Sequence, residues 1–585
     1  MKYPFSLTPW LCIVTILAST PLTKAALELN FADSGLTSIT FQGHNYLAEG
    51  KPTLSLVEQI NTEGKSHRAS NKPSQTTYDK AAQTLTQTYD WGTFSIHYGL
   101  SGDQLHLTVT LNNTSNETIQ VVQGNLLQLT FPNLPDNHAW RQRRVSDDNI
   151  DGPTILAVPH DEALLVLCNE DFIAPLRSGF DAINRETGQA TVFFRLGGED
   201  ASKVTLPDGN IAYVHARGEA RGRSRDGRNH LDRLTLHRPI APGKQGTFTL
   251  SLRFADRSST TAAVAADIYA GWREQHPMTL VWPDRRPITT AFVSSSAKQH
   301  QSATNPRGWL NDPRIDITTE EGLAQFRKQL MHYADRCIAG AERLNAQAII
   351  VWDIEGQEMP HPISYIGDPR MLAEMAPEMD ALADEFFARM RDAGYGVGVT
   401  LRPTIVSEDP DKPGSYRHRY GLDESGTTFV DRLADKIAYA HDRWGVTYIY
   451  IDTNIIYRPD REGKWTSQLI SPRDWAELNR RFPDILLIPE FGSTTDRGHT
   501  GPYAELRPHY WGNVASTNIH DRTLYPEAFT VINISDGPID NRWDDLVRGV
   551  SQGDILMTRS WWSGQNEHEK VIKIYEEAAT LKADE

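Results

Sequence analysis

Cysteine is scarce in this sequence, and the motifs that cysteine usually builds are absent. Only Cys12, Cys168 and Cys337 occur among 585 residues, and they lie far apart. No Cys/His cluster has the spacing of metal ligands, so the sequence predicts no zinc site. A chain of this length buries a core that needs no disulfide bonds, and its low cysteine content is therefore compatible with an oxidising compartment.

The sequence also lacks an excess of positive charge. It carries 59 Lys and Arg against 75 Asp and Glu, a formal net charge of −16. Phosphate binding relies on clustered Lys and Arg, so we expect neither nucleic acid nor an anionic membrane as a partner. No Gly-rich phosphate loop follows any predicted strand, and a nucleotide-binding fold gains no support. The sequence predicts no cofactor.

No apolar run is long enough to cross a bilayer, which takes about 20 residues. The best candidate, Trp10 to Ala18, follows the basic Lys2 and precedes the small residues around Thr23 to Ala25. This is the layout of a secretory signal peptide, and we predict residues 1–25 to be one. Its loss removes two lysines and no acid, which moves the charge from −16 to −18. We expect a secreted or periplasmic protein, the alternative being a retained N-terminal anchor.

The remaining chain divides into two parts with different hydrophobic periods. Residues 26–257 consist of short alternating segments such as "QLHLTVTLNNTS" and "GTFTLSLRFAD", separated by Gly, Asn, Asp and Pro clusters. This pattern is typical of an antiparallel β-sandwich. Residues 258–286 are predicted to be a linker, with a helix over Thr260 to Pro277 that ends at the proline.

Residues 287–585 alternate apolar strands with amphipathic helices, which indicates parallel βαβ units. Seven strands are predicted at Ile288–Ser294, Ala348–Asp353, Gly396–Arg402, Thr447–Thr453, Ile485–Phe491, Phe529–Ser535 and Asp554–Ser560. We place an eighth within Tyr503–Ser516, whose pattern is aromatic but irregular. Eight strands would close a (β/α)8 TIM barrel, with a doubly wound open sheet as the rival topology. The predicted fold class is thus a β-sandwich followed by a (β/α)8 barrel.

Active sites of such barrels lie at the C-terminal ends of the strands. In the fourth predicted strand, isoleucines alternate with Tyr450, Asp452 and Asn454, so period two directs the polar set into the barrel mouth. The same phase places Glu490 inward on the fifth strand. Adjacent strands lie roughly 4.8 Å apart. The two carboxyls would therefore approach the separation of about 5 Å that retaining glycosidases use.

This pairing predicts catalytic roles for both acids. Asp452 would attack the anomeric carbon, and Glu490 would donate a proton to the leaving oxygen. The proximity of two like charges itself raises the pKa of one member of such a pair. The structural alternative is that Asp452 caps the following turn and Glu490 pairs with an arginine at the barrel mouth.

Other strand ends supply candidate substrate contacts. Asp353 and Glu355 in "VWDIEGQE" are expected to alternate on one strand face and to hold sugar hydroxyls, with a calcium ion as the alternative ligand. Arg402 ends the third strand, where its planar guanidinium suits a neighbouring carboxylate or a charged substrate group. Arg559 ends the eighth strand and is predicted to contact substrate as well.

Aromatic residues near the same end of the barrel are candidate stacking platforms. The chain contains 14 Trp and 20 Tyr, and flat rings stack on the C–H faces of sugars. Trp511 and Trp561 are the predicted platforms. Because neighbouring residues of an extended chain point in opposite directions, only one of Trp561 and Trp562 would face the sugar.

The positions of Asp452, Glu490 and Asp536, ending the fourth, fifth and seventh strands, resemble retaining α-glycosidases of the α-amylase-like clan. With the preceding sandwich, the chain is most similar to the α-N-acetylgalactosaminidase families. The resemblance covers roughly Pro287 to Thr580 and rests on placement rather than on a diagnostic string. It departs at Tyr450, where amylase-like enzymes keep an arginine.

The string "YIYID" also resembles the Y-x-K-x-D of the α-galactosidase and α-glucosidase barrels, with Tyr450 in place of their lysine. Both resemblances imply an α-glycosidic bond and a nucleophilic Asp452. They differ on whether Glu490 or Asp536 is the acid.

The sequence thus predicts a secreted retaining α-glycosidase acting on oligo- or polysaccharide. Two other functions stay open at this stage. One is a non-catalytic carbohydrate-binding protein on a degenerate barrel. The other is a polysaccharide lyase, which needs a Tyr, His or Lys base beside an arginine. The sugar, endo or exo action and the oligomeric state are not specified by these patterns.

Overall fold

The computed structural model describes most of the chain between Leu27 and Asp584. The described ranges are 27–50, 56–62, 72–131, 143–144, 155–159, 163–170, 177–180, 183–184, 186–196, 201–205, 211–216, 231–236, 240–295, 297–356, 366–408, 416–419, 428–452, 455–459, 465–470, 472–490, 495–506, 517, 519–535, 537–560 and 567–584. The predicted signal peptide lies outside these ranges, so its cleavage and the expected secretion stay predictions.

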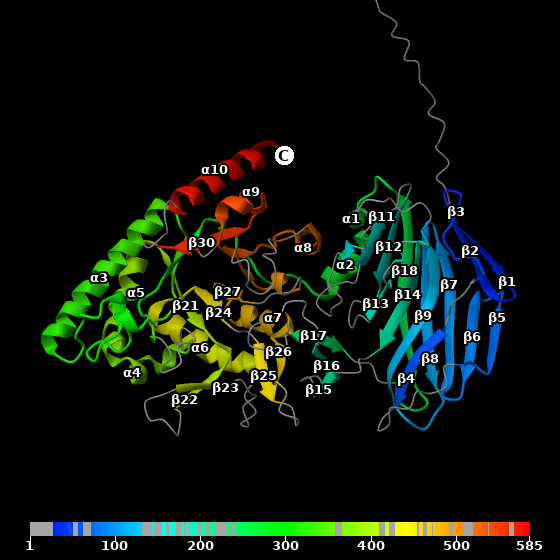
Figure 1. The fold of residues 1–585 in the computed structure, drawn as a ribbon, viewed down its shortest axis with the longest axis horizontal. Coiled ribbons are helices and arrows are strands. Elements are labelled where there is room, and N and C mark those ends of the chain that lie inside the picture. The colour runs from blue at the N-terminus through cyan, green and yellow to red at the C-terminus, as the bar shows by residue number, and fades with distance from the viewer. Residues whose placement is uncertain are drawn as a thin grey trace, which may run out of the picture.

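The N-terminal part contains two large antiparallel sheets (Figure 1). One has the order β10-β11-β12-β18-β8-β7-β6-β5, formed by β5 (Gln75–Asp79), β6 (Thr84–Tyr89), β7 (Gly92–Ser101), β8 (Gln104–Asn113), β10 (Arg143–Arg144), β11 (Ile155–Pro159), β12 (Ala163–Asn169) and β18 (Gln245–Asp256). The other has the order β13-β14-β9-β4, formed by β4 (Leu56–Thr62), β9 (Ile119–Thr130), β13 (Arg177–Phe180) and β14 (Gln189–Leu196).

Side chains from the two sheets form one core, as the predicted sandwich requires. Along β8, every second residue is buried, which is the period of a strand with one face on a core. The ring of Phe94 on β7 stacks on Phe194 of β14 at 5.7 Å, and Phe194 lies 4.7 Å from Phe248 of β18. The antiparallel β-sandwich prediction is confirmed.

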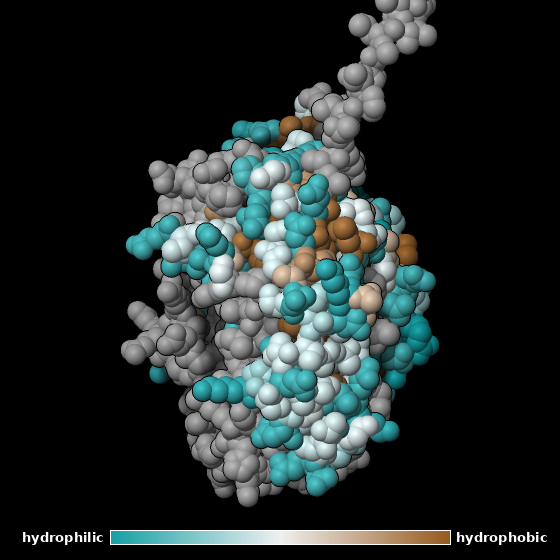
Figure 2. All heavy atoms as spheres, turned by 90° about the vertical axis from the view of Figure 1, so that its right-hand side faces the viewer, coloured by the Kyte–Doolittle hydropathy of each residue, from teal (hydrophilic) through white to brown (hydrophobic). Residues whose placement is uncertain are grey.

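Two small sheets accompany the sandwich. β1 (Glu28–Ala32), β2 (Gly35–Phe41) and β3 (His44–Asn45) form one, and β15 (Ala201–Thr205), β16 (Ile211–Ala216) and β17 (Leu231–Leu236) form the other. On the sandwich end of the molecule, most described side chains are hydrophilic or intermediate, and hydrophobic ones gather mainly in the upper part of the view (Figure 2).

No helix in the described ranges combines the length and apolarity that a bilayer crossing requires.

The linker is helical, as predicted, and joins the two domains through an apolar junction. It contains α1 (Thr261–Val264), capped by the hydroxyl of Thr260, and α2 (Ala266–Gln275). The buried face of α2 packs between strands β11 and β12 and a barrel segment that includes Tyr525. The Tyr525 hydroxyl donates to the carbonyl of His276 at 3.0 Å. The junction therefore contacts the barrel at the segment that leads into β29 (Val531–Asn533).

Eight parallel strands follow in sequence order around the barrel. They are β19 (Ile288–Ala291), β20 (Ala348–Val351), β21 (Gly396–Leu401), β24 (Tyr448–Ile451), β27 (Leu486–Pro489), β28 (Tyr503–Glu505), β29 (Val531–Asn533) and β30 (Ile555–Arg559). β19 pairs with β30, and the Gly501 N–H donates to the Leu487 carbonyl at 3.0 Å just before β28. All eight strands that the sequence predicts are present, in a nearly closed ring.

Helices surround this ring, as a βα alternation requires. They are α3 (Glu320–Arg343), α4 (Leu372–Met375), α5 (Pro377–Asp392), α6 (Phe429–Trp444), α7 (Pro472–Arg481), α8 (Ile519–Leu524), α9 (Trp543–Ser551) and α10 (Glu567–Asp584). Two antiparallel hairpins follow the third and fourth barrel strands: β22 (Ile405–Glu408) with β23 (Tyr416–Arg419), and β25 (Ile455–Pro459) with β26 (Trp465–Leu469).

The strands separate an inner core from an outer one. On β24, Tyr448 and Tyr450 belong to the cluster inside the barrel, whereas Ile449 and Ile451 pack with the helices. Glycine on β21 makes room for the tyrosines: a Cβ at Gly398 would come within 2.6 Å of the Tyr448 carbonyl oxygen. The alternation assumed for β24 and β27 is thus confirmed, and it directs the next residues in phase into the barrel mouth.

Candidate active site

Asp452 and Glu490 directly follow neighbouring strands. β24 and β27 pair in parallel, with Tyr450 opposite Ile488. The same pairing continues one step further, because the Glu490 N–H donates to the Ile451 carbonyl at 2.9 Å. Each acid therefore lies two residues beyond an inward-facing, paired residue. The placement of both acids directly after neighbouring strands is as predicted, and the inward direction of the two side chains and the separation of their carboxyl oxygens stay predictions.

Arg402 holds Asp452 from the other side. The backbone N–H of Asp452 donates to Leu401 at 2.9 Å, which aligns the end of β24 with the end of β21. Arg402 Nε donates to Asp452 Oδ2 at 2.5 Å, and Nη2 contacts the same oxygen. Both residues are buried, with exposed fractions of 2% and 5%. The predicted carboxylate partner of Arg402 is therefore Asp452, and a buried guanidinium supplies positive charge to the candidate nucleophile.

Tyr450 belongs to a row of aromatic rings rather than to a charged pair. Its ring stacks on Trp352 at 4.3 Å and meets Tyr503 edge-on at 5.0 Å. Trp352 in turn lies 5.7 Å from Phe292, which is 40% exposed. The position where similar families keep an arginine or lysine is thus filled by ring packing, and the cation beside Asp452 comes from the adjacent strand as Arg402.

The predicted alternation of Asp353 and Glu355 on a strand face is wrong. β20 ends at Val351, and the Gly356 N–H donates to the Asp353 carbonyl at 2.9 Å, which closes a turn. Asp353 is 0% exposed. Its Oδ1 accepts from the Val293 N–H at 2.8 Å, and its Oδ2 accepts from the Ser294 N–H at 3.0 Å and the Ser294 hydroxyl at 2.6 Å. These bonds join the ends of β19 and β20 and favour a structural role.

Glu355 is buried at the same end of the barrel. It is 1% exposed, and within the described ranges its Oε1 has no hydrogen-bond partner. Burial, with a smaller contribution from the negative charge of Asp368, raises the pKa of Glu355 to about 8. This direction favours the neutral acid at pH 7. Among the described residues there is no cluster of His, Cys, Asp and Glu that could hold a metal ion, so the calcium alternative gains no support there.

Glu505 is a carboxylate that the sequence analysis missed. It ends β28 in the inward phase and is 8% exposed. The Tyr503 hydroxyl donates to its Oε2 at 2.8 Å and accepts from Asn533 Nδ2 at 2.8 Å. The signal was present in the alternation of Tyr503 and Glu505, but a three-residue strand is too short to stand out from an irregular segment.

Of the remaining predicted site residues, one lies within the described ranges and four lie outside them. Arg559 ends β30 at the barrel mouth, opposite Thr290 of β19, and is partly buried. Asn454, Trp511, Asp536 and Trp561 lie outside the described residues. Their roles stay predictions, including the choice between Glu490 and Asp536 as acid.

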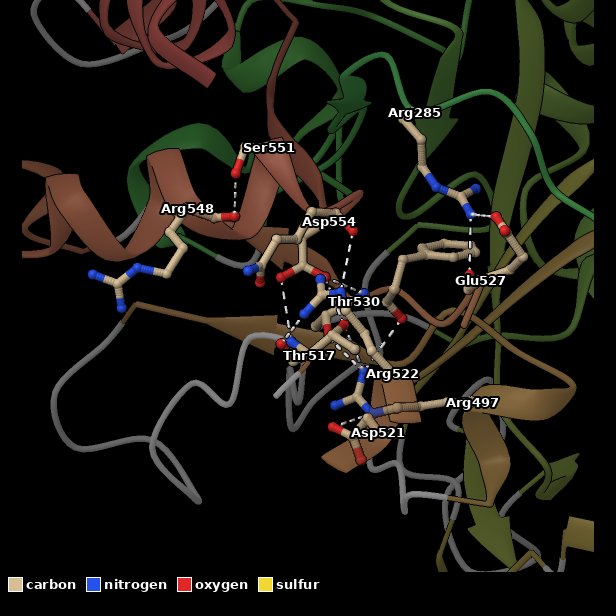
Figure 3. Close-up of polar contacts among 12 residues, drawn as sticks. Arg285, Arg497, Thr517, Asp521, Arg522, Glu527, Thr530, Arg548, Ser551 and Asp554 are labelled. Atoms are coloured by element: carbon tan, nitrogen blue, oxygen red, sulfur yellow. Dashed lines mark hydrogen bonds and ion pairs between the residues drawn. The ribbon is translucent and has the colours of Figure 1, made fainter. Parts of the chain in front are cut away.

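A second polar cluster lies at the opposite end of the strands (Figure 3). Asp554 directly precedes β30 and is 0% exposed. Its Oδ1 accepts from the Thr530 N–H at 2.9 Å, from the Thr517 hydroxyl at 2.6 Å and from Arg522 Nη2 at 3.2 Å. Arg497 and Asp521 form an adjacent ion pair at 3.1 Å. Residues at this end of a TIM barrel serve stability, so we exclude the cluster from the candidate active site.

Comparisons with known proteins find only distant structural matches. No family model matches the sequence, and no curated protein matches it. An α-N-acetylgalactosaminidase from Bifidobacterium bifidum shares 10% identity at a TM-score of 0.45, over 95% of this chain and 92% of that one. A glycoside hydrolase family 97 enzyme from Pseudoalteromonas sp. strain K8 shares 8% at 0.41, over 96% and 82%.

An α-galactosidase from Lactobacillus brevis shares 13% identity at a TM-score of 0.39, over 95% of this chain and 78% of that one. These solved structures are therefore similar to the chain along most of its length. Because each TM-score is below 0.5, the similarity does not decide what this chain does.

Proposed function

We propose that the chain is a secreted or periplasmic retaining glycoside hydrolase that cleaves α-glycosidic bonds in oligo- or polysaccharides. The observation that carries this proposal is the register of β24 and β27. It sets Asp452 and Glu490 on neighbouring strands at the end of the barrel where such enzymes keep their active sites.

Asp452 is the nucleophile in this proposal. It attacks the anomeric carbon while the glycosidic bond breaks, which forms a covalent glycosyl-enzyme. Arg402 supports this role because both of its contacts go to Oδ2 of Asp452. The guanidinium holds Oδ2 and places a positive charge beside the carboxylate, and Oδ1 is the oxygen that attacks.

Glu490 is the acid/base. It gives its proton to the leaving oxygen and then takes one from the water that hydrolyses the intermediate. Glu490 is partly exposed, whereas Asp452 is buried. That difference suits a group that exchanges its proton with water between the two steps. Asp536 and Glu505 are the competing acids.

Two substrate classes come first in testing, α-galactosides and α-N-acetylgalactosaminides, because the resemblance of the sequence points to them. Aryl α- and β-glycosides of common hexoses are incubated with the protein, and NMR follows the anomer released first. Release of the α-anomer from an α-glycoside is expected. Release of the β-anomer first would overturn retention, and an ultraviolet-absorbing unsaturated product would indicate a lyase.

Azide identifies the roles of the acids. Glu490→Ala, Glu505→Ala and an alanine variant of Asp536 are assayed on an aryl α-glycoside with and without sodium azide. The acid/base variant accumulates the glycosyl-enzyme, and azide should release it as an α-glycosyl azide. Rescue of the Asp536 or Glu505 variant instead of Glu490→Ala would reassign the acid. If neither wild type nor Asp452→Asn turns over any glycoside but both bind one, the protein is a carbohydrate-binding protein.

A further inference from the structure

Lys436 is a fully buried lysine near the candidate active site. It lies on α6, has an exposed fraction of 0%, and was not singled out by its sequence context. Lysine is almost never fully buried unless it is paired, because removing an ammonium group from water is costly. The contacts of Lys436 must therefore account for its position.

Four oxygen atoms surround the Lys436 ammonium group. Nζ donates to the carbonyls of Arg402 and Thr404, each at 2.8 Å, and lies 3.4 Å from the carbonyl of Gly367. Asp368 Oδ2 completes the set at 3.2 Å. Three carbonyls and one carboxylate around a positive charge are the ligands that a bound cation would take. Here the cation is covalently attached to the fold.

These contacts join three separate segments of the barrel. Gly367 and Asp368 follow the second strand, Arg402 and Thr404 follow the third, and Lys436 lies on the helix before the fourth. The Arg402 N–H donates to the Gly367 carbonyl at 2.9 Å. Gly367 has φ +70°, and a Cβ there would come within 2.8 Å of the Arg402 backbone nitrogen. The backbone of Arg402 is thus bound on both its N–H and its carbonyl sides.

The side chain of the same Arg402 holds Asp452. A shift of the Arg402 backbone would therefore move the guanidinium relative to the carboxylate. We propose that Lys436 is a positioning residue that acts as a built-in cation, fixing Arg402 so that its guanidinium orients Asp452. This proposal deepens the glycosidase proposal and rests on it for the consequence in catalysis.

Charged groups around Lys436 limit its working pH range. Asp368 faces it and is shared with Arg370, whose Nε and Nη2 both lie 2.9 Å from the carboxylate. Glu355 is the other acid nearby. Burial, partly opposed by Asp368, lowers the pKa of Lys436 to about 8. The ammonium form is therefore lost as the pH rises through this value, and the positioning should weaken above it.

The first test compares Lys436→Met with Lys570→Met on the glycoside that wild type hydrolyses best. Lys570 is a matched control, because it also binds an aspartate, Asp540 at 2.7 Å, but on the outer surface. We expect kcat to fall roughly 100-fold in Lys436→Met, as for a misplacement of about 1 Å, with KM changed little. Lys570→Met should match wild type. A Lys436→Met enzyme with wild-type kcat overturns the proposal.

The pH profile separates positioning from a purely structural role. Wild-type kcat should fall above about pH 8, as Lys436 loses its proton. In Lys436→Met the part of this fall that belongs to Lys436 should be absent, so the limb should differ in shape from that of wild type. Glu355, whose pKa is also about 8, and the acid/base keep their own contributions. A structural residue would instead lower the fraction of folded enzyme and leave the shape of the profile unchanged. An alkaline limb that persists unchanged in Lys436→Met overturns the proposal.

A double-mutant cycle tests the coupling without any turnover. Urea midpoints are measured for wild type, Lys436→Met, Asp452→Asn and the double variant. If Lys436 acts through Arg402 on Asp452, the shift caused by Lys436→Met should shrink in the Asp452→Asn background. Additive shifts overturn the proposal. The midpoint shifts could also be non-additive in a protein that hydrolyses no glycoside. That result would support the positioning of Asp452 by Lys436 and overturn only the glycosidase proposal. If Lys436→Met fails to fold, Asp368→Asn replaces it in the kcat test and the double-mutant cycle. In the pH test, Asp368→Asn should instead move the alkaline limb to lower pH, because Lys436 loses the carboxylate that raises its pKa.

Discussion

The two ends of the barrel both contain buried arginine–aspartate pairs, but the pairs are attached differently. At the strand starts, Asp554 Oδ1 accepts hydrogen bonds from a backbone N–H, from the Thr517 hydroxyl and from Arg522. At the strand ends, Arg402 Nε and Nη2 both contact Oδ2 of the Asp452 carboxylate. The Asp554 carboxylate therefore bonds to several groups of the fold, whereas the Asp452 carboxylate is oriented by one arginine. This difference separates a stabilising cluster from a candidate active site.

The largest expected effect is on activity at the strand ends. Asp452→Asn keeps the shape and a hydrogen-bond acceptor for Arg402 but removes the nucleophilic charge. We expect kcat on an aryl α-glycoside to fall at least ~10³-fold, the scale of losing a catalytic nucleophile. Circular dichroism serves as the control and should show a folded protein. Activity within tenfold of wild type would remove Asp452 from the mechanism.

The second prediction concerns stability at the strand starts. Asp554→Ala leaves Arg522 without its buried carboxylate, and breaking such a pair costs about 3–5 kcal/mol. Urea unfolding should therefore show a much lower midpoint, while the kcat of the molecules that remain folded is unchanged. Loss of kcat with an unchanged midpoint would contradict the assignment of stability to the strand starts and of activity to the strand ends.

Glu355 sharpens the comparison through pH. The pKa of Glu355 is about 8 in the folded protein, whereas its ordinary value, which applies to the unfolded chain, is 4.5. As the pH rises, the unfolded chain therefore loses this proton at a lower pH than the folded protein does. The contribution of Glu355 to the free energy of unfolding should accordingly fall between about pH 5 and pH 8 and then level off. Glu355→Gln cannot ionise and should gain relative stability over that window, by more than ~1.4 kcal/mol, the value of one pKa unit.

The readout is the difference in urea midpoint between Glu355→Gln and wild type at pH 5, 6.5 and 8. A difference that stays constant across this range would show that Glu355 is not held neutral by burial. The same series on Lys570→Met, at the outer surface, should be flat.

The smallest effect is expected away from both ends. Arg327 on α3 and Glu385 on α5 form an ion pair at 2.5 Å, with exposed side-chain fractions of 55% and 41%. Exposed pairs contribute about 0–1 kcal/mol because water and salt screen them. Glu385→Gln should therefore change neither kcat nor the urea midpoint measurably. A large destabilisation would mean that surface charge, and not the buried networks, dominates stability.

The strands of the barrel were predictable because each is a short local pattern. All eight appear in the expected order, and the inward phase of Asp452 and Glu490 follows from the alternation on β24 and β27. The ends of the strands were less predictable, because the predicted strands run past the observed ends. The second strand is an example. It ends at Val351, because Asp353 bonds to the backbone of residues 59 and 60 positions earlier, and no local pattern can report that bond.

The sequence by itself determined the two domains, the barrel topology and the pair of neighbouring strands that carry the candidate acids, since hydrophobic period depends on residues close together in the chain. Only the tertiary structure decided the electrostatics of the site. Arg402 is 50 residues from Asp452 and 34 from Lys436, and these groups meet because barrel closure brings successive strand ends together. The ionisation of a buried group depends on such neighbours in space, and sequence spacing does not record them.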